Sequence, residues 1–318
     1  MKNRPEELYD LVHIDYIRLP CVRTTAFIAS SIKYLKNNVK AIWAIPLANA
    51  RAFKYNFVYI NILRNGEKMQ KILSAMRRAI QDYNMIADGD RIFVGLSGGK
   101  DSVLLLNALA AYRRFSPEHF TLEAVTIDMG LKDADKSEMC ALTANCESLD
   151  VPHHIIKTDI AEIIFDTRKE TNPCSLCAKM RRGALNSAIN DLGGGKLALG
   201  HNADDVAETM IMSLIYEGRF SCFSPTAYMD KSGVSLIRPF IYIEECDIIS
   251  TVKRLELPIV NNPCPMNHVS KREYAKNLIK SICKDVPFAK DRILGAIYHP
   301  ERNNLWHPST ANSDNNID

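Results

Sequence analysis

The sequence predicts an α/β protein built on a doubly wound, mostly parallel sheet. After residue 66, short apolar runs alternate with longer segments whose apolar residues recur at helical spacing. Strands that alternate with helices of this length form βαβ units, whose parallel sheet is covered by helices on both faces. The chain has 318 residues, 47% of them apolar and 24% charged, which is enough for one large domain with an appendage or for two ordinary domains.

The regular pattern begins with one amphipathic helix that starts at Glu67 and ends before Ala87. Strands are expected at residues 91–96, 121–128, 153–158, 196–200 and 234–240. Helices are expected between them, at about residues 101–114, 136–149, 178–192 and 204–216. Ligands of such sheets bind outside the carboxyl ends of the strands, so functional residues should follow these runs directly.

The two ends of the chain are expected to lie outside this domain, which spans residues 67–283. Residues 1–66 are expected to form a basic, N-terminal helical extension, with ten Lys or Arg against four Asp or Glu. An internal start at Met69 is the alternative, because that residue opens the first well-patterned helix. Residues 284–318 are expected to form a helical and polar tail.

Composition excludes several classes of protein. No apolar stretch approaches the roughly 18 residues of a membrane helix, and no signal-peptide pattern opens the chain. We therefore expect a cytoplasmic protein with no membrane partner. Nine cysteines, an odd number, argue against a disulfide framework in a reducing compartment.

The first strand runs directly into the sequence LSGGKDS, residues 96–102, and then into a helix. Gly98 and Gly99 let the backbone approach an oxyanion, and the helix N-terminus points free N–H groups at the same place. Ser97 and Ser102 add hydroxyl groups, and Lys100 adds a cation. The spacing fits neither a Walker loop nor a dinucleotide fingerprint.

This string resembles the S-G-G-x-D-S motif of the PP-loop ATP pyrophosphatases, and here Asp101 occupies its acidic position. The resemblance implies an ATP-binding loop formed by residues 97–102. It also implies that ATP is cleaved to AMP and pyrophosphate, with an adenylated intermediate.

A second polar group, GHNADD, follows the strand at residues 196–200. Asp204 and Asp205 could hold Mg²⁺, which prefers oxygen ligands, or they could cap the next helix. Asp101 has the same two interpretations. His201 is expected at the same nucleotide site, and Ile127 and Gly200 are expected at the adenine pocket because they stand at the ends of two predicted strands.

Three cysteines form the third candidate functional group in the sequence. Cys174 and Cys177 form a C-x-x-C at the start of a helix, and Cys264 stands far along the chain in the sequence PCP. Two thiolates of this spacing can bind one metal or cluster, and a distant third can complete the site. From the residues alone, zinc, redox and iron–sulfur interpretations all stay open.

These motifs occur in one order: LSGGKDS, CSLCAKMRRGAL, GHNADDVAET, RPF and PCP. In this order they resemble the TtcA family of tRNA 2-thiolation enzymes over residues 67–283. The resemblance implies an adenine nucleotide α-hydrolase-like fold and a [4Fe-4S] cluster held by Cys174, Cys177 and Cys264, with one iron free of protein ligand.

The resemblance also implies the reaction, which is ATP-dependent and Mg²⁺-dependent thiolation of a tRNA pyrimidine at C2, most simply cytidine 32. The cluster would present sulfide to the adenylated base. Lys100, Asp101 and Asp205 are the candidate catalytic residues. A cysteine desulfurase is the expected sulfur source, and a homodimer is a candidate assembly.

Four alternatives remain at this point. The chain could be a 2-thiouridine-forming relative, or another PP-loop ligase or synthetase with structural zinc. Cys174 or Cys177 could carry a persulfide with no cluster, or the protein could bind nucleotide or RNA without catalysis. Lys179, Arg181 and Arg182, directly after the C-x-x-C, either contact RNA phosphates or form a solvated helix face.

Overall fold

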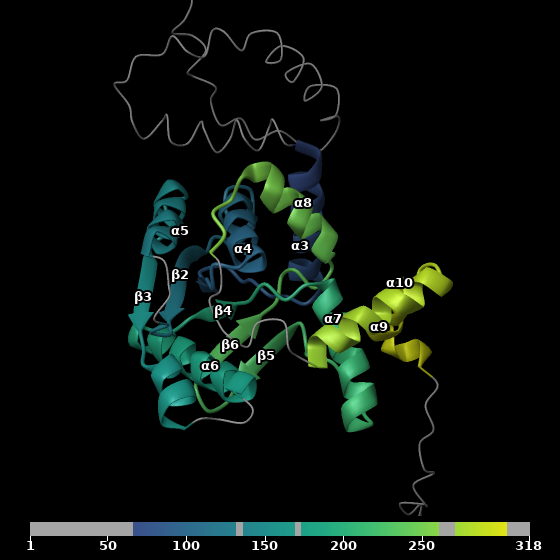
Figure 1. Ribbon diagram of the computed structural model, residues 1–318. Helices are drawn as coiled ribbons and strands as arrows, with labels where there is room; N and C mark the ends of the chain where they lie inside the picture. Colours follow the sequence, from purple (N-terminus) through teal and green to yellow (C-terminus); the bar gives the residue numbers. More distant parts are fainter. Residues whose placement is uncertain (1–65, 132–135, 169–172, 261–270, 304–318) are drawn as a thin grey trace, which may run out of the picture. The chain divides into compact units, whose positions relative to one another are not determined.

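Six strands form one sheet in the part of the chain that the structure describes (Figure 1). The structure is a computed structural model that describes residues 66–131, 136–168, 173–260 and 271–303, all within one unit of residues 54–318. The strands are β1 (Arg91–Gly95), β2 (Thr121–Asp128), β3 (His153–Lys157), β4 (Lys196–Ala198), β5 (Thr226–Met229) and β6 (Val234–Ile237). Their order is β3-β2-β1-β4-β6-β5, and every pair is parallel except β5 with β6.

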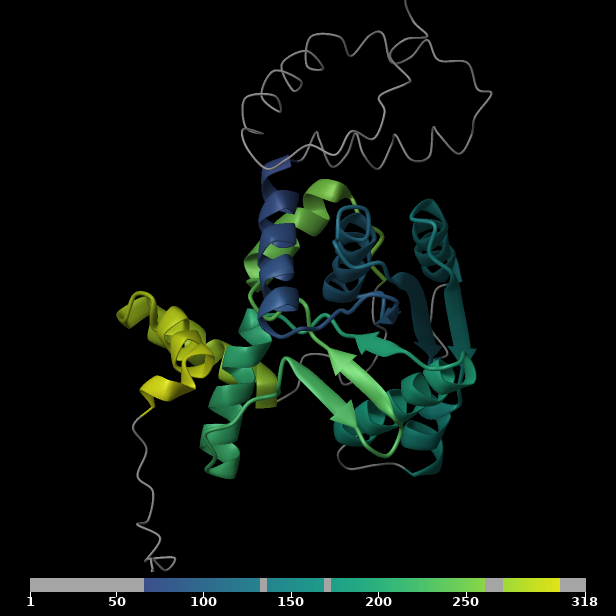
Figure 2. The ribbon, with the colours of Figure 1, turned by 180° about the vertical axis from the view of Figure 1, so that it is seen from behind.

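Helices cover both faces of this sheet. They are α3 (Gly66–Asp82), α4 (Lys100–Tyr112), α5 (Lys136–Ser148), α6 (Pro173–Asp191), α7 (Ala203–Met212), α8 (Glu245–Leu255), α9 (Lys271–Asp285) and α10 (Ala289–Tyr298). Short helical turns complete the set, namely η2 (Glu162–Thr167), η3 (Ser213–Glu217) and η4 (Pro300–Arg302). Figures 1 and 2 show α3, α4, α5 and α8 on one face and α6 on the other. The fold class is therefore the doubly wound α/β sheet that the sequence predicts.

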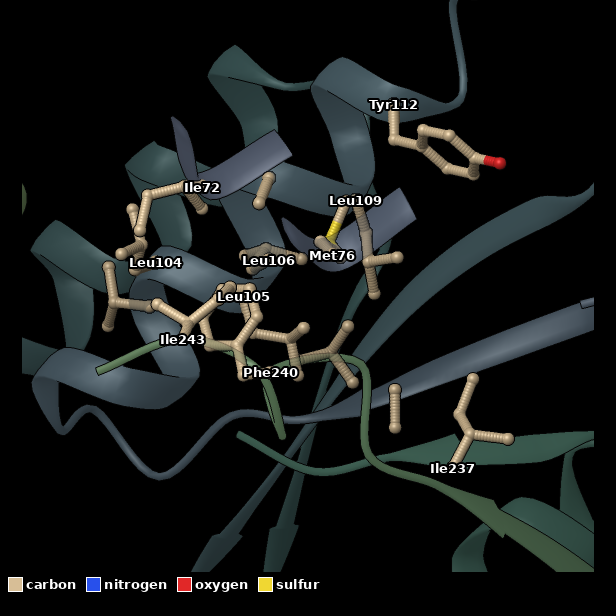
Figure 3. Close-up of a cluster of buried hydrophobic side chains, with 14 of the residues drawn as sticks. Ile72, Met76, Leu104, Leu105, Leu106, Leu109, Tyr112, Ile237, Phe240 and Ile243 are labelled. Carbon is tan, nitrogen blue, oxygen red and sulfur yellow. The ribbon is translucent and has the colours of Figure 1, made fainter. Parts of the chain in front are cut away.

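The larger hydrophobic core lies between the sheet and the layer of α3, α4 and α8 (Figure 3). From Val103 onward helix α4 is apolar except for Asn107, and it is buried along nearly its whole length, as expected for a helix packed on several sides. Phe240, Leu106 and Met76 are fully buried there. Each such side chain contributes about 1.5–3 kcal/mol by its burial, so this layer fixes α4 and the loop before it.

The candidate site lies next to β1, where the order of the strands changes direction. The chain moves outward from β1 to β2 and β3, and then returns to place β4 on the other side of β1. The register pairs Val94 of β1 with Ala124 of β2 and with Ala198 of β4. The loops after β1 and β4 therefore emerge side by side, which is where α/β sheets of this kind form a crevice for ligands.

Several boundaries differ from those predicted. Strand β5 is missed because its side chains are exposed or half-buried and form no apolar run. Strand β6 ends at Ile237 rather than residue 240, since Pro239 has no N–H for a ladder. Helix α6 begins at Pro173, five residues before the predicted start.

The expected ends of the chain are described only in part. Residues 1–65 of the N-terminal extension and residues 304–318 of the tail lie outside the described residues. Within the tail, α10 confirms the expected helix. In the described ranges, no helix has the length and apolar character needed to span a membrane.

Two tyrosines of the core, the fully buried Tyr112 and the half-buried Tyr298, give a paired test of their hydroxyl groups. The Tyr112 hydroxyl is buried without a partner among the described residues, whereas the Tyr298 hydroxyl donates to the carbonyl of Ile241 at 2.7 Å. Tyr112→Phe should leave the free energy of unfolding equal or higher, because it removes an unsatisfied polar group. Tyr298→Phe should lower it by about 1 kcal/mol. Urea denaturation of both variants checks this, and an equal loss in the two would contradict it.

Candidate active site

The loop after β1 is held in shape by its two serines. The hydroxyl groups of Ser97 and Ser102 lie 3.1 Å apart. The backbone N–H of Ser97 donates to the Ser102 hydroxyl at 3.2 Å, and that hydroxyl donates to the carbonyl of Gly99 at 2.9 Å. These short-range bonds close the loop on itself, so its remaining backbone N–H groups are presented in a fixed arrangement.

Two helix N-termini meet at this edge of the sheet and differ in one respect. Helix α7 is closed by a capping box, in which Asn202 accepts from the N–H of Asp205 and Asp205 accepts from the N–H of Asn202. Helix α4 begins after Gly99, which has no side chain to cap it. The first N–H groups and the positive end of α4 are therefore available to an anion, and phosphate groups bind at such helix ends.

Gly98 is required by a close contact. Its φ is +81°, and a Cβ atom there would lie 2.6 Å from the Cβ of Val260. The Gly98 carbonyl also accepts from the N–H of Val260 at 3.0 Å. This hydrogen bond holds the phosphate loop against Val260, which lies four residues before Cys264.

Lys100 is the cation of the loop and is paired with two carboxylates. Its Nζ lies 2.9 Å from Asp101 and 3.1 Å from Glu245 at the start of α8. The other oxygen of Glu245 contacts Lys276 of α9 at 2.7 Å. Burial alone would raise the pKa of Glu245, but hydrogen bonds from Lys276 and Lys100 hold it below its usual range.

Asp101 and Asp205 lie close to one another across the two helix starts. The amide of Asn202 donates to Asp101 at 3.0 Å, and the same side chain caps α7 together with Asp205. The other oxygen of Asp205 pairs with Arg272 of α9 at 2.9 Å. The structure places both carboxylates at the carboxyl edge of the sheet, and capping is one role that Asp205 performs.

Asp204 faces a different set of partners. It accepts from the backbone N–H of Glu245 at 2.7 Å and pairs with Lys290 of α10 at 2.9 Å. Lys290 also contacts Glu244 at 2.9 Å. Asp204 therefore holds the start of α8 and α10 against α7.

His201, predicted at the nucleotide site, lies at the carboxyl end of β4 in contact with Arg238. The Nε of Arg238 donates to the His201 Nδ1 at 3.2 Å, and the guanidinium stacks on Phe223 with 4.8 Å between its central carbon and the ring centroid. Burial, reinforced by Arg238, lowers the pKa of His201 to about 4, so the ring is neutral at pH 7.

Arg238 is a site residue that was not predicted from the sequence. It is only 8% exposed, and among the described residues no carboxylate pairs with it. Burial, together with the nearby charge of Arg182 on α6, lowers its pKa to about 10. A buried cation without an acidic partner favours an anionic ligand. Its signal was the RPF motif, which follows the last parallel strand.

The two residues expected at the adenine pocket, Gly200 and Ile127, have different surroundings. Gly200 lies directly against the first turn of α4, because a Cβ there would be 2.9 Å from the backbone of Asp101. Ile127 lies near the end of β2 and packs on the smaller core between the sheet and α6. Both lie at the carboxyl edge of the sheet.

The cysteine pair lies at this edge too. Cys174 is exposed in the first turn of α6, and the sulfur of half-buried Cys177 lies 3.7 Å from that of Met129, which directly follows β2. Thiols three residues apart at a helix N-terminus suit a soft metal or an iron–sulfur cluster, since the helix end favours thiolates. Cys264, the third predicted ligand, lies outside the described residues.

The basic residues of α6 follow the pair. Lys179 and Arg182 are exposed and Arg181 is half-buried, and none has an acidic partner in the ranges that the structure describes. Arg182 is close enough to His201 and Arg238 to lower the pKa of both. The first turns of α6 therefore present uncompensated positive charge at the site.

Glu208, one turn beyond Asp205 on α7, gives a pH-dependent prediction. It is 5% exposed, and burial raises its pKa to about 7 from 4.5. The folded chain therefore holds this proton more tightly than the unfolded chain, so the free energy of unfolding falls as the pH rises from about 4.5 to 7. Glu208→Gln should remove this fall.

Urea denaturation at pH 5 and pH 8 checks the prediction. Relative to the unmodified chain, Glu208→Gln should gain up to about 3 kcal/mol between the two pH values. Glu162→Gln, at an exposed position, is the matched control and should show no such gain. An identical pH dependence in the Glu208 variant and the unmodified chain would refute the assignment.

Comparison with known proteins agrees with this geometry. The model of the PP-loop domain matches residues 67–283. The chain is 36% identical to a tRNA-cytidine(32) 2-sulfurtransferase of Geobacter sulfurreducens, over 72% of this chain and 90% of the relative. It is 34% identical to a protein of the same name from Syntrophotalea carbinolica, over 76% and 93%.

One solved structure is similar over most of the described domain. It is the U34-tRNA thiolase NcsA from Methanococcus maripaludis with its [4Fe-4S] cluster. The TM-score is 0.61 at 26% identity, covering 74% of this chain and 80% of that one. With the open helix end, the paired cysteines and these relatives together, the chain belongs to the PP-loop family and, within it, to the TtcA family of tRNA-cytidine(32) 2-sulfurtransferases.

Proposed function

We propose that this protein thiolates tRNA in an ATP-dependent reaction, replacing the C2 oxygen of cytidine 32 with sulfur. The observation that carries the proposal is the meeting of an uncapped helix end and a pair of cysteines at one edge of the sheet. The named relatives act on cytidine 32, which favours this base over the uridine of the structurally similar thiolase.

The first step is activation of the base. The C2 oxygen attacks the α-phosphorus of ATP, the bond to the β-phosphate oxygen breaks, and pyrophosphate leaves. The N–H groups at the start of α4 and the Lys100 ammonium hold the departing pyrophosphate. Arg238 and Arg182 add positive charge beside His201 and keep the nucleotide phosphates in place.

Mg²⁺ is expected to enter with the nucleotide. Among the predicted carboxylates, Asp101 faces the phosphate loop most directly, and its present partners are Lys100 and Asn202. Asp205 is joined to Asp101 through Asn202, whereas Asp204 faces α8 and α10. We therefore favour Asp101 and Asp205 over Asp204 as ligands.

The second step introduces sulfur. A [4Fe-4S] cluster on Cys174, Cys177 and Cys264 would supply the sulfur atom that attacks C2, and AMP leaves with the former C2 oxygen. Val260 is fastened to Gly98, so the extended length of four residues keeps the Cα of Cys264 within about 15 Å of Val260. A cysteine desulfurase is the proposed source of the sulfur.

Basic side chains of the protein bind the phosphate backbone of the RNA. Lys179 and Arg182 on α6 are exposed, have no acidic partner among the described residues, and follow the cysteines directly. Phosphate contacts of this kind position a nucleic acid without reading its sequence. Bases modified in RNA are reached in single-stranded loops, where they can be turned out of the stack.

Mass analysis of tRNA nucleosides tests the function. A strain without this chain should lack 2-thiocytidine, and the unmodified chain should restore it. Lys100→Ala and Asp101→Asn should restore at most about 1% of it, because each removes a group from the activation step. Restoration of a 2-thiouridine instead would overturn the choice of base, and unchanged nucleosides would overturn the function.

Anaerobic purification tests the metal site. The unmodified protein should be brown, with broad absorption near about 400 nm that oxygen bleaches. Cys174→Ser and Cys177→Ser should lose both the colour and 2-thiocytidine while ATP binding is kept. Cys140→Ser, at an exposed position on α5, is the matched control. A colourless protein that contains zinc would contradict the cluster.

A further inference from the structure

Helix α7 does not end at the crevice but continues away from it. Beyond Met212 the chain forms one wide turn, η3, which ends at Gly218 in a left-handed conformation with φ +62°. In Figures 1 and 2 this continuation and α6 both lie at the end of the sheet toward which β2 and β3 point. The continuation therefore flanks the same edge as the cysteines.

This segment exposes a run of large apolar side chains. Leu214, Ile215, Tyr216 and Phe220 are each between 44% and 49% exposed. Four such residues within seven positions form a surface that ordinary monomers avoid unless it binds a partner. We call these four residues the η3 patch.

Cations border the patch and favour a negatively charged partner. The Nζ of Lys271, at the start of α9, lies 4.7 Å from the centroid of the Tyr216 ring. Arg219 is exposed between Tyr216 and Phe220, and no acidic partner of it lies in the described ranges. Aromatic rings interleaved with Lys and Arg are the usual platform for unstacked bases of single-stranded nucleic acid.

The aromatic residues continue from the patch into the crevice. Phe223, three residues after Phe220, is half-buried under Arg238, and its ring centroid lies 5.0 Å from that of His201. A ring at the surface is thus followed by one beside the nucleotide site. The first turns of α6 carry positive charge without acidic partners in the described chain, and Arg182 there is close enough to His201 to lower its pKa.

We infer that the η3 patch is the RNA-binding platform on which bases of the anticodon loop stack, while α6 holds the loop's phosphates. The inference rests on the proposed function and adds the surface that receives the substrate. Stacking on Tyr216 and Phe220 would hold the flanking bases and leave the target base free to turn inward past Phe223.

Binding of an unmodified tRNA transcript to the full-length protein tests this, measured by fluorescence anisotropy. The double variant Tyr216→Ala, Phe220→Ala should raise the Kd by about tenfold or more, with the salt dependence of Kd unchanged. Tyr216→Phe should restore most of the ring's contribution. Tyr228→Ala, which removes a 64% exposed ring on β5, is the control and should change Kd by less than about twofold.

Lys179→Ala provides the contrast. It should weaken binding and also reduce the slope of log Kd against log salt by about one, because it removes a phosphate contact rather than a stacked ring. The dependence of Kd on salt concentration therefore distinguishes the contribution of the η3 patch from that of α6.

The outcomes separate this inference from the proposed function. If the unmodified protein binds no tRNA, both are wrong. If it binds tRNA and the double variant binds equally well, the platform alone is wrong. A double variant that keeps its affinity for tRNA but changes its sedimentation coefficient would identify the patch as a contact between two copies of the chain, which also overturns the inference.

Discussion

The close approach of β4 to the first turn of α4 is the constraint on which the rest of the site depends. Gly200 packs against the backbone of Asp101 with no room for a side chain. This contact places the start of α7 beside the start of α4, so that Asn202 can join Asp101 to Asp205. Two loops separated by about a hundred residues thereby become one polar surface.

Charged side chains extend this surface to the C-terminal helices. Arg272 and Lys276 stand one turn apart on α9, and they pair with Asp205 on α7 and Glu245 on α8. Glu245 in turn contacts Lys100 of the loop. The two ion pairs of Glu245 are partly buried, so removing this carboxylate would leave two cations without their partner. The position of α9 and the shape of the phosphate loop are therefore coupled.

The fold could be predicted because its signals are local. A strand, a glycine-rich turn and an apolar helix stand in sequence at residues 91–112, and the alternation of strand and helix recurs along the chain. Strand β5 was not predictable in this way, because it is stabilised by antiparallel pairing with β6 and not by an apolar run of its own.

The site could be predicted in its motifs but not in its partners. Ser97 to Ser102, His201 and the cysteine pair lie at the predicted edge of the sheet. The roles of Arg238 and Arg272 could not be inferred, because each depends on contacts with residues 37 and 67 positions away. Capping and ion pairing by Asp204 and Asp205 likewise appear only when α8, α9 and α10 are in place.

The paired state of Lys100 has a consequence for how the enzyme selects its nucleotide. The ammonium group already contacts Asp101 and Glu245, so a phosphate bound here would share Lys100 with two carboxylates and add negative charge beside them. A ligand accompanied by its own divalent cation relieves that imbalance, whereas a bare anion increases it. Taken with the proposed function, this charge balance would favour a nucleotide that arrives with a bound metal ion over the bare nucleotide.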